Sequence, residues 1–255
     1  MTTRLVALLA ASFVAAAFAC ADDYSFKEPF TKTGAFSAAG SVSLENVNGD
    51  VEIRTWDKNE ILIEGEKSAK TEEELKAVDL TMDLSESRAA IKVRLPKRSN
   101  SWFSGSTIRA SVRFTLTVPT AAVLERIATV NATVAVDGAC GKAHVETVNG
   151  NIRAANLGGS AWFKTVNGQI KATFATVAGG QEFSFETVNG SVTAVLPGNA
   201  GLALRTSVVN GQVDCDFPLT LTKSSGKRNL SGTIGDGRAS LTAETVNGSI
   251  HIEQR

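Results

Sequence analysis

The chain has 255 residues, of which 43% are hydrophobic and 20% are charged, so it can bury a sizeable core in one or two domains and is not a disordered protein. Lys and Arg together equal Asp and Glu at 26 each, which excludes a protein that gathers nucleic acid or an acidic membrane through its overall charge. Aromatic residues make up only 6% and Gly is frequent at 22 residues, a composition that favours short strands joined by tight turns over a helical bundle.

The first residues are typical of a secretory signal peptide. Arg4 precedes the apolar run LVALLAASFVAAAFA, and small residues follow at the spacing of a cleavage site. We expect cleavage after residue 19 or after residue 21, so that residues 1–21 are removed and the mature protein reaches the periplasm, the outer membrane or the cell surface. The run is too short for a comfortable membrane span, and no transmembrane segment is expected after its removal. Alternatively, Cys20 after AFA becomes the lipidated first residue of a bacterial lipoprotein.

The part of the chain before residue 120 alternates as strands do, but without a regular repeat. Polar and apolar residues alternate over residues 59–69, 89–96 and 107–119. Only residues 71–78 predict a helix, with Thr71 as its N-cap and Glu74 completing a capping box. We therefore expect a less regular β-sheet at the N-terminal end of the fold.

The loop KRSNSWFSGS, over residues 97–106, carries charge together with two aromatic residues, Trp102 and Phe103. One interpretation makes it a contact loop, because binding residues are often found on loops. In the alternative, the two rings fold back as an apolar lid on the end of the fold.

A nine-residue pattern centred on Val-Asn recurs along the chain. The copies are ENVNGDVEI, ATVNATVAV, ETVNGNIRA, KTVNGQIKA, ETVNGSVTA, SVVNGQVDC and ETVNGSIHI. Their Asn residues are Asn48, Asn131, Asn149, Asn167, Asn189, Asn210 and Asn247. The middle copies are separated by 18, 18, 22 and 21 residues, a period that is typical of solenoids and of serial hairpin arrays.

Each copy predicts two strands that meet at the Asn. After Asn-Gly, polar and aliphatic residues alternate strictly, which is the pattern of a half-buried strand. Before the Asn, an apolar residue such as Val145 stands four positions ahead, and a charged residue such as Glu146 usually stands three positions ahead. A second strand therefore enters each corner.

The geometry of the corner decides between two folds. Asn-Gly between alternating runs is a strong signal for a type I′ hairpin. Such a hairpin would place Val148, and the equivalent Val of the other copies, on the solvent-exposed face. A bend with Asn149 in the left-handed region would instead let Val148 and Ile152 both face inward. Identical residues would then stack every ~4.8 Å, and the Asn side chains would hydrogen-bond up the column. The sequence therefore predicts a solenoid in which the repeated Asn residues form a structural corner ladder.

Residues 221–238 interrupt the repeat and separate the last two Asn positions, 210 and 247, by 37 residues. They would form either a looped-out segment or a degenerate rung. In the solenoid, Cys140 and Cys215 would lie on the order of 15 Å apart, beyond the roughly 7 Å between Cα atoms that a disulfide allows. We therefore expect two free, buried thiols.

The residues that could carry catalysis are scattered. His144 and His251 are isolated on outward strand positions, whereas zinc takes clustered N or S ligands, so no metal site is expected. The chain has no Gly-x-Ser-x-Gly elbow, phosphate loop or dinucleotide fingerprint. Asp214 and Asp216 share a strand face and could act as the paired carboxylates of a glycosidase, although such pairs often serve solubility alone.

The whole pattern resembles a known family. A chain with the opening SVSLENVNGDVEIRTWDKNEILIEGEKSA, a strand that ends in TLTVP and serial TVNGxI copies is similar to the bacterial putative-adhesin family of unknown function, over residues 39–252. The resemblance implies a single-chain, right-handed, β-helix-like solenoid at the cell envelope and carries over no catalytic residues. One departure is VNA at residues 130–132, where Ala replaces Gly, which argues that the second corner position need not have a positive φ.

The predicted organisation is one all-β domain after the signal peptide. Residues 22–38 lead into the domain, which covers residues 39–252. Its irregular β part is expected over residues 39–120 and its regular rungs over residues 121–252, in a parallel β-helix-like solenoid.

These features predict a non-enzymatic cell-envelope protein without a cofactor, whose strand faces serve adhesion or scaffolding. Its partner would be an envelope or surface component, such as a glycan or a protein, and not a nucleic acid. The alternatives are a polysaccharide-active β-helix enzyme and a lipoprotein scaffold in envelope sensing. An enzyme would need like groups that converge from adjacent rungs, whereas the outward residues Arg153, Lys171, Thr193 and Asp214 are mixed in character.

Overall fold

The computed structural model describes residues 24–95, 109–138, 141–225 and 228–255, without the side chains of residues 221–225. The signal peptide over residues 1–21, lipidation at Cys20, the contact-loop residues Trp102 and Phe103, and the thiol of Cys140 lie outside the described residues. The described chain is almost entirely β-structure. Within it, no helix is long and apolar enough to cross a membrane.

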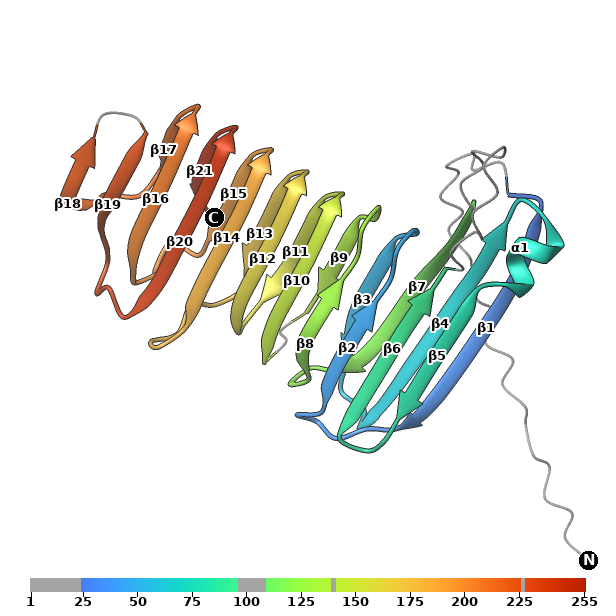
Figure 1. Cartoon of the computed structure of the whole chain (residues 1–255). Helices are drawn as coiled ribbons and strands as arrows, with labels where there is room; N and C mark the ends of the chain where they lie inside the picture. The colour runs from blue at the N-terminus through green and yellow to red at the C-terminus, as the bar shows by residue number, and fades with distance from the viewer. Residues whose placement is uncertain (1–23, 96–108, 139–140, 226–227) are drawn as a thin grey trace, which may run out of the picture.

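Two β-sheets lie face to face along the molecule (Figure 1). The 10-stranded sheet A has the order β1 (Phe26–Ala35), β4 (Glu60–Ala69), β7 (Ala110–Pro119), β3 (Val51–Trp56), β9 (Val134–Asp137), β11 (Ile152–Leu157), β13 (Ile170–Phe174), β15 (Val192–Leu196), β21 (Ile250–Gln254) and β17 (Val213–Cys215). The 11-stranded sheet B has the order β18 (Thr220–Ser225), β19 (Asn229–Ile234), β16 (Leu202–Asn210), β20 (Ala239–Asn247), β14 (Glu182–Asn189), β12 (Ser160–Asn167), β10 (Lys142–Asn149), β8 (Val123–Ala128), β2 (Ser41–Glu45), β6 (Arg88–Arg94) and β5 (Asp79–Leu84).

The repeated copies stack as parallel rungs, each made of a strand of sheet B, a corner and a strand of sheet A. β10 pairs in parallel with β12, so that Val145 lies beside Phe163 and Asn149 lies beside Asn167. β10 pairs on its other side with β8 rather than with β11, the strand that follows it in the chain. The predicted solenoid is therefore confirmed, and the type I′ hairpin alternative is wrong.

The side chains at the corner point in other directions than the sequence predicts. Val148 is 40% exposed, whereas Thr147 is only 4% exposed. The strand alternation continues through the corner, because β10 stays extended up to Asn149. The Thr147 hydroxyl donates to the carbonyl oxygen of Ala132 in the neighbouring rung at 3.2 Å, so its burial leaves no unpaired donor. The prediction of an inward Val is therefore wrong, although the solenoid that it supported is correct.

The Asn residues at the corners do not adopt the predicted left-handed conformation. Among the described residues other than Gly, only Asn156 has a positive φ, of 55°. At the middle corners the Gly is explained by close approach instead: a Cβ on Gly168 would clash with the carbonyl oxygen of Gly150, and a Cβ on Gly190 would clash with that of Gly168. At other corners, Gly49, Gly211 and Gly248 also have a positive φ, which favours Gly. At the middle corners, neighbouring rungs therefore approach backbone to backbone and leave no room for a side chain.

The last copy in the chain is not the last rung of the stack. β20 and β21 insert between the rung β14–β15 and the rung β16–β17 (Figure 1). Before returning to this place, the chain forms the hairpin β18–β19, and β19 pairs antiparallel with β16. Residues 221–238 are therefore neither a looped-out segment nor a degenerate rung, because they supply most of a hairpin that extends the end of sheet B.

The N-terminal end is the less regular sheet that the sequence predicts. β6 and β7 flank the first rung, β2–β3, while β4 pairs antiparallel with β7 and β1 pairs antiparallel with β4. The predicted helix is the short α1 (Glu72–Lys76), and the Thr71 hydroxyl accepts a hydrogen bond from the backbone N–H of Glu74 at 3.2 Å. The strand β1 occupies most of the segment that leads into the domain.

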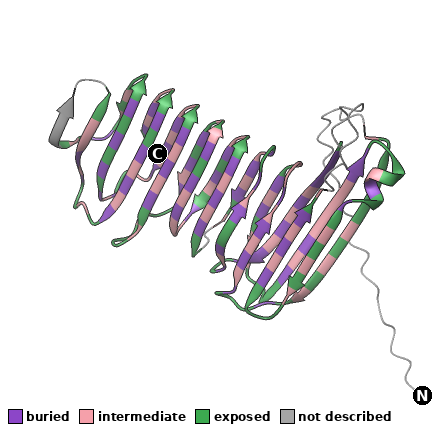
Figure 2. Ribbon diagram, viewed as in Figure 1, coloured by how far each residue is buried: buried purple, intermediate pink, exposed green. Residues whose placement is uncertain are grey.

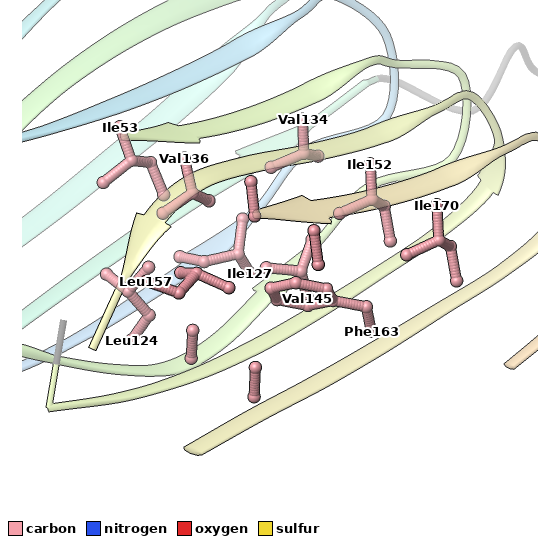
Figure 3. Close-up of a cluster of buried hydrophobic side chains, with 14 of the residues drawn as sticks. Ile53, Leu124, Ile127, Val134, Val136, Val145, Ile152, Leu157, Phe163 and Ile170 are labelled. Carbon is pink, nitrogen blue, oxygen red and sulfur yellow. The ribbon is translucent and has the colours of Figure 1, made fainter. Parts of the chain in front are cut away.

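The core lies between the two sheets and is continuous along the stack. Buried and exposed residues alternate along the strands (Figure 2). Ile152 and Ile170 of sheet A face inward opposite Val145 and Phe163 of sheet B (Figure 3). The rings of Phe163 and Phe185 stack with centroids 5.3 Å apart, so identical positions of neighbouring rungs pack on each other. This core fixes which residues face outward and thereby positions the candidate site.

Candidate functional site

The Asn side chains at the corners form one hydrogen-bonded ladder. The amide nitrogen of Asn167 donates to the amide oxygen of Asn149 at 2.8 Å, and the amide nitrogen of Asn189 donates to that of Asn167 at 2.8 Å. The same bond joins all the corners, in the order Asn48, Asn131, Asn149, Asn167, Asn189, Asn247 and Asn210. The interior amides of the ladder use both a donor and the acceptor on one another, which leaves little capacity for a ligand.

A column of Val side chains runs beside this ladder on the outer face of sheet B. We call it the valine column, and in the order of the stack it consists of Val47, Val130, Val148, Val166, Val188, Val246 and Val209. Val148 is 40% exposed and Val209 is 54% exposed, at positions where neighbouring strands are in register. With ~4.8 Å between paired strands, the column is ~29 Å long and one side chain wide.

A row of charged residues lies next to the valine column on the same face. This charged row consists of Glu45, Arg126, Glu146, Lys164, Glu186 and Glu244. Arg126 bridges two rungs, because its Nη2 lies 2.9 Å from Glu146 Oε2 and its Nη1 lies 3.8 Å from Glu45 Oε1. Lys164 Nζ donates to Glu186 Oε2 at 2.7 Å. Charges of opposite sign therefore neutralise one another along much of the row.

The ion pairs move the pKa values of Glu45, Glu146 and Lys164 further away from neutral pH. A hydrogen bond from Lys92 lowers the pKa of Glu45, against a smaller opposing effect of burial. Burial alone would raise the pKa of Glu146, but the hydrogen bond and the charge of Arg126 outweigh it and lower the pKa. The hydrogen bond to Glu186 raises the pKa of Lys164. The charged row is thus a set of fixed carboxylates and cations rather than of groups poised to transfer protons.

A shallow hollow of about 570 Å³ opens over this face where the row is interrupted. The register of β8 shifts relative to β10 and β2, so that Ala128 lies between Glu45 and Glu146 where a long side chain would complete the row. Val130 and Val148 also line the hollow, and Arg126 stands at its rim. The small Ala128 side chain therefore opens an apolar floor inside a charged border.

The His and Asp residues that the sequence singled out do not converge on one centre. His144 Nε2 lies 2.9 Å from Glu146, whereas His251 Nδ1 lies 3.4 Å from Asp214 on the opposite sheet. Asp216 accepts a hydrogen bond from the backbone N–H of Gln254 at 3.4 Å. Within the described ranges, no three His, Cys, Asp or Glu residues are grouped so that they could hold a metal ion.

Cys215 is a free thiol, but it is half-buried rather than fully buried as predicted. It lies on β17, the last strand of sheet A, where no further strand covers it. Burial raises the pKa of the Cys215 thiol, so the thiolate, which is the reactive form, is disfavoured.

The valine column is the main feature that the sequence prediction missed. Thr165 stands two positions before Asn167 and is buried, so the alternation that begins at Phe163 places Val166 outward. That parity was visible in the sequence. The sequence prediction instead places the repeated Val in the core, because aliphatic residues are usually buried.

A family model and several solved structures match parts of the chain. Residues 134–253 match the family described as Toastrack DUF4097. A putative cell adhesion protein from Clostridium sporogenes is 14% identical with a TM-score of 0.46, and the match covers 89% of this chain and 100% of that one. A putative adhesin from Bacteroides fragilis is 11% identical, with a TM-score of 0.41 and coverage of 88% and 97%. A putative lipid binding protein from Parabacteroides distasonis is 12% identical, with a TM-score of 0.30 and coverage of 88% and 96%. No curated protein matches the sequence.

Proposed function

Because residues 134–253 match the family described as Toastrack DUF4097, we propose that the protein is an exported, non-enzymatic solenoid of the cell envelope that acts as an adhesin or a surface-interaction scaffold. The contact surface is the outer face of sheet B, with the valine column and the charged row. The exposed, in-register valine column is the observation that carries this proposal.

Exposed apolar side chains that form a continuous patch mark interaction sites more often than scattered ones do. The valine column is continuous over the rungs. Five of its members are 37% to 54% exposed, and Val47 and Val166 are partly buried. Covering one half-exposed Val contributes on the order of 1 kcal/mol, so contact with several rungs supports specific binding. A column one side chain wide fits a narrow, linear partner better than a globular one.

The state of the charged groups on this face supports the proposed non-enzymatic role. Glu146 forms an ion pair with Arg126, and Glu186 forms one with Lys164. These pairs link neighbouring rungs, and the carboxylates do not converge on one point where a substrate atom could react. Export rests on the sequence of residues 1–21, which predicts either cleavage after residue 19 or 21 or lipidation of Cys20.

The test is capture of envelope material by the purified mature protein. The variant Val148→Thr, Val166→Thr, Val188→Thr keeps the shape of each side chain and makes the column polar. We expect this variant to lose most of the capture. The matched control is Val195→Thr, which makes the same change on the outward side of sheet A and should leave capture intact. Equal capture by both variants and the unchanged protein would contradict the proposal.

Export has a separate readout. Intact-mass analysis of the protein from the envelope fraction of its host is expected to show loss of residues 1–19 or 1–21, or a lipidated Cys20. Full-length protein found only in the soluble interior of the cell would refute export.

A further inference from the structure

Trp162 is a large aromatic residue on the outer face of sheet B that packs into no core. It lies on β12, where the buried neighbours Ala161 and Phe163 point inward and Trp162 points outward, partly exposed. Parallel pairing places His144 on one side of it and Ser184 on the other. The partly exposed ring of Trp162 thus lies between polar side chains in the middle of the proposed contact face.

Trp56 shows what a structurally engaged Trp looks like in the same protein. Its indole N–H donates to the carbonyl oxygen of Glu60 at 2.8 Å, and Lys58 Nζ lies 4.8 Å from the centre of its ring. Trp162 has neither kind of partner among the described residues. Its indole N–H is therefore free to donate to a ligand, whereas the indole N–H of a buried Trp normally finds a partner in the protein.

The groups around Trp162 are polar and held in place. Two positions further along β12, ~6.6 Å away, Lys164 is bonded to Glu186. Glu146 is fixed by Arg126 and by His144, so its carboxylate oxygens have defined positions. The outward row that contains Trp162 continues across the sheet with hydrogen-bonding side chains, in the order His144, Trp162, Ser184, Thr242 and Arg205.

A flat apolar ring with a free N–H beside fixed carboxylates and a hydroxyl matches an amphipathic, ring-shaped ligand. A pyranose offers a face of C–H groups for the ring and a rim of hydroxyls for the polar groups. We propose that Trp162 is the stacking platform of a glycan-binding subsite, in which Ser184, Glu146 and the indole N–H hold sugar hydroxyls. This inference rests on the proposed function, because it names the class of ligand for the same face.

The charge of the face selects among glycans. In the charged row beside Trp162, the four acids Glu45, Glu146, Glu186 and Glu244 outnumber the two cations Arg126 and Lys164. Carboxylate groups of a uronate would meet these fixed acids at short range and be repelled. The subsite therefore takes neutral pyranose chains in preference to acidic ones.

The test measures binding of soluble glycans to the mature protein by calorimetry and by the fluorescence of its Trp residues. The probes are neutral oligosaccharides of glucose and of N-acetylglucosamine, with oligogalacturonate as the acidic comparison. We expect at least one neutral probe to bind more tightly than oligogalacturonate. Trp162→Ala should weaken its binding at least tenfold, Trp162→Phe should weaken it less, and Trp56→Phe should leave it unchanged.

Three results would overturn the subsite: no neutral probe binds, Trp162→Ala binds as tightly as the unchanged protein, or oligogalacturonate is preferred. Because Trp162 faces outward, its variants are expected to have the same melting temperature as the unchanged protein, which a thermal melting scan checks. If soluble glycans do not bind while envelope capture still depends on the valine column, the glycan subsite fails and the proposed function stands. A protein partner is then the remaining occupant of this face.

Discussion

Gly168 illustrates how one residue is fixed by its neighbours in the stack. Its missing side chain lets the corner approach the carbonyl oxygen of Gly150, and Gly190 approaches Gly168 in the same way. The position does not need a left-handed backbone, which agrees with Ala132 in the corresponding place of an earlier copy.

The close approach at Gly168 gives a stability prediction. Gly168→Ala places a methyl group against a backbone that cannot move without parting two rungs, and we expect it to lower the free energy of unfolding by ~3 kcal/mol. The matched control is Gly34→Ala, where a Cβ meets only the Leu84 side chain at 3.9 Å and little change is expected. Urea denaturation measures both, and equal stabilities would refute the close-packed corner.

The Asn ladder gives a second prediction at the same scale. Asn167→Leu removes the bonds to Asn149 and from Asn189 and leaves their polar groups without partners. We expect the free energy of unfolding to fall by about 2 kcal/mol while envelope capture stays unchanged. An unchanged melting temperature with lost capture would instead make the Asn residues a binding group.

The elements show where sequence reasoning succeeds. Alternation is a local property, and the strands that it predicts over residues 59–69 and 89–96 correspond to β4 and β6. Register is also accessible, because equal copies such as ETVNG stack like on like. The order of the rungs is not accessible, since β20 carries the same motif as β14 and nothing in its residues says that it inserts before β16.

The charged row predicts how stability depends on pH. The pKa of Glu146 is lower in the folded protein than its ordinary value of 4.5, so its ion pair stabilises the fold above pH 4.5. That contribution is lost as the pH falls through the lowered pKa. Because these pairs are partly exposed, the contribution is below about 1 kcal/mol and should shrink in high salt.

The check compares Glu146→Gln with the unchanged protein by thermal melting between pH 7 and strongly acidic conditions. We expect the variant to be the less stable at pH 7 and the difference to close below pH 4.5. Glu253→Gln, at an exposed position of β21, serves as the control and should show no such convergence. A difference that stays constant with pH would contradict the role assigned to the ion pair.

At the scale of the whole molecule, the stack explains both stability and surface. Each rung buries its apolar residues only against its neighbours, so the ends need cover. The hairpin β18–β19 extends sheet B at one end, and β1, with Pro29 and Lys32, forms the edge of sheet A at the other. Proline and lysine on an edge strand discourage pairing with another chain, which leaves the broad outer faces as the surfaces for contact.

The candidate site was only partly accessible from the sequence. The outward position of Glu146 and Lys164 follows from parity and is present in the structure. The valine column is absent from the sequence prediction, because a repeated aliphatic residue is usually assigned to the core. The hollow at Ala128 depends on a register shift in β8, which the repeat pattern does not predict. Trp162 belongs to no recognisable motif, and its position between His144 and Ser184 depends on how the neighbouring rungs stack.

The central claim is that the outer face of sheet B is the contact surface. Hydroxyl-radical footprinting of the mature protein, with and without bound envelope material, tests it most directly, because it reports the solvent access of individual side chains. We expect reduced labelling of Val148, Val188 and Trp162, with no change at Val195 on sheet A. Protection of Val195, with Val148 and Val188 labelled as in the free protein, would contradict it.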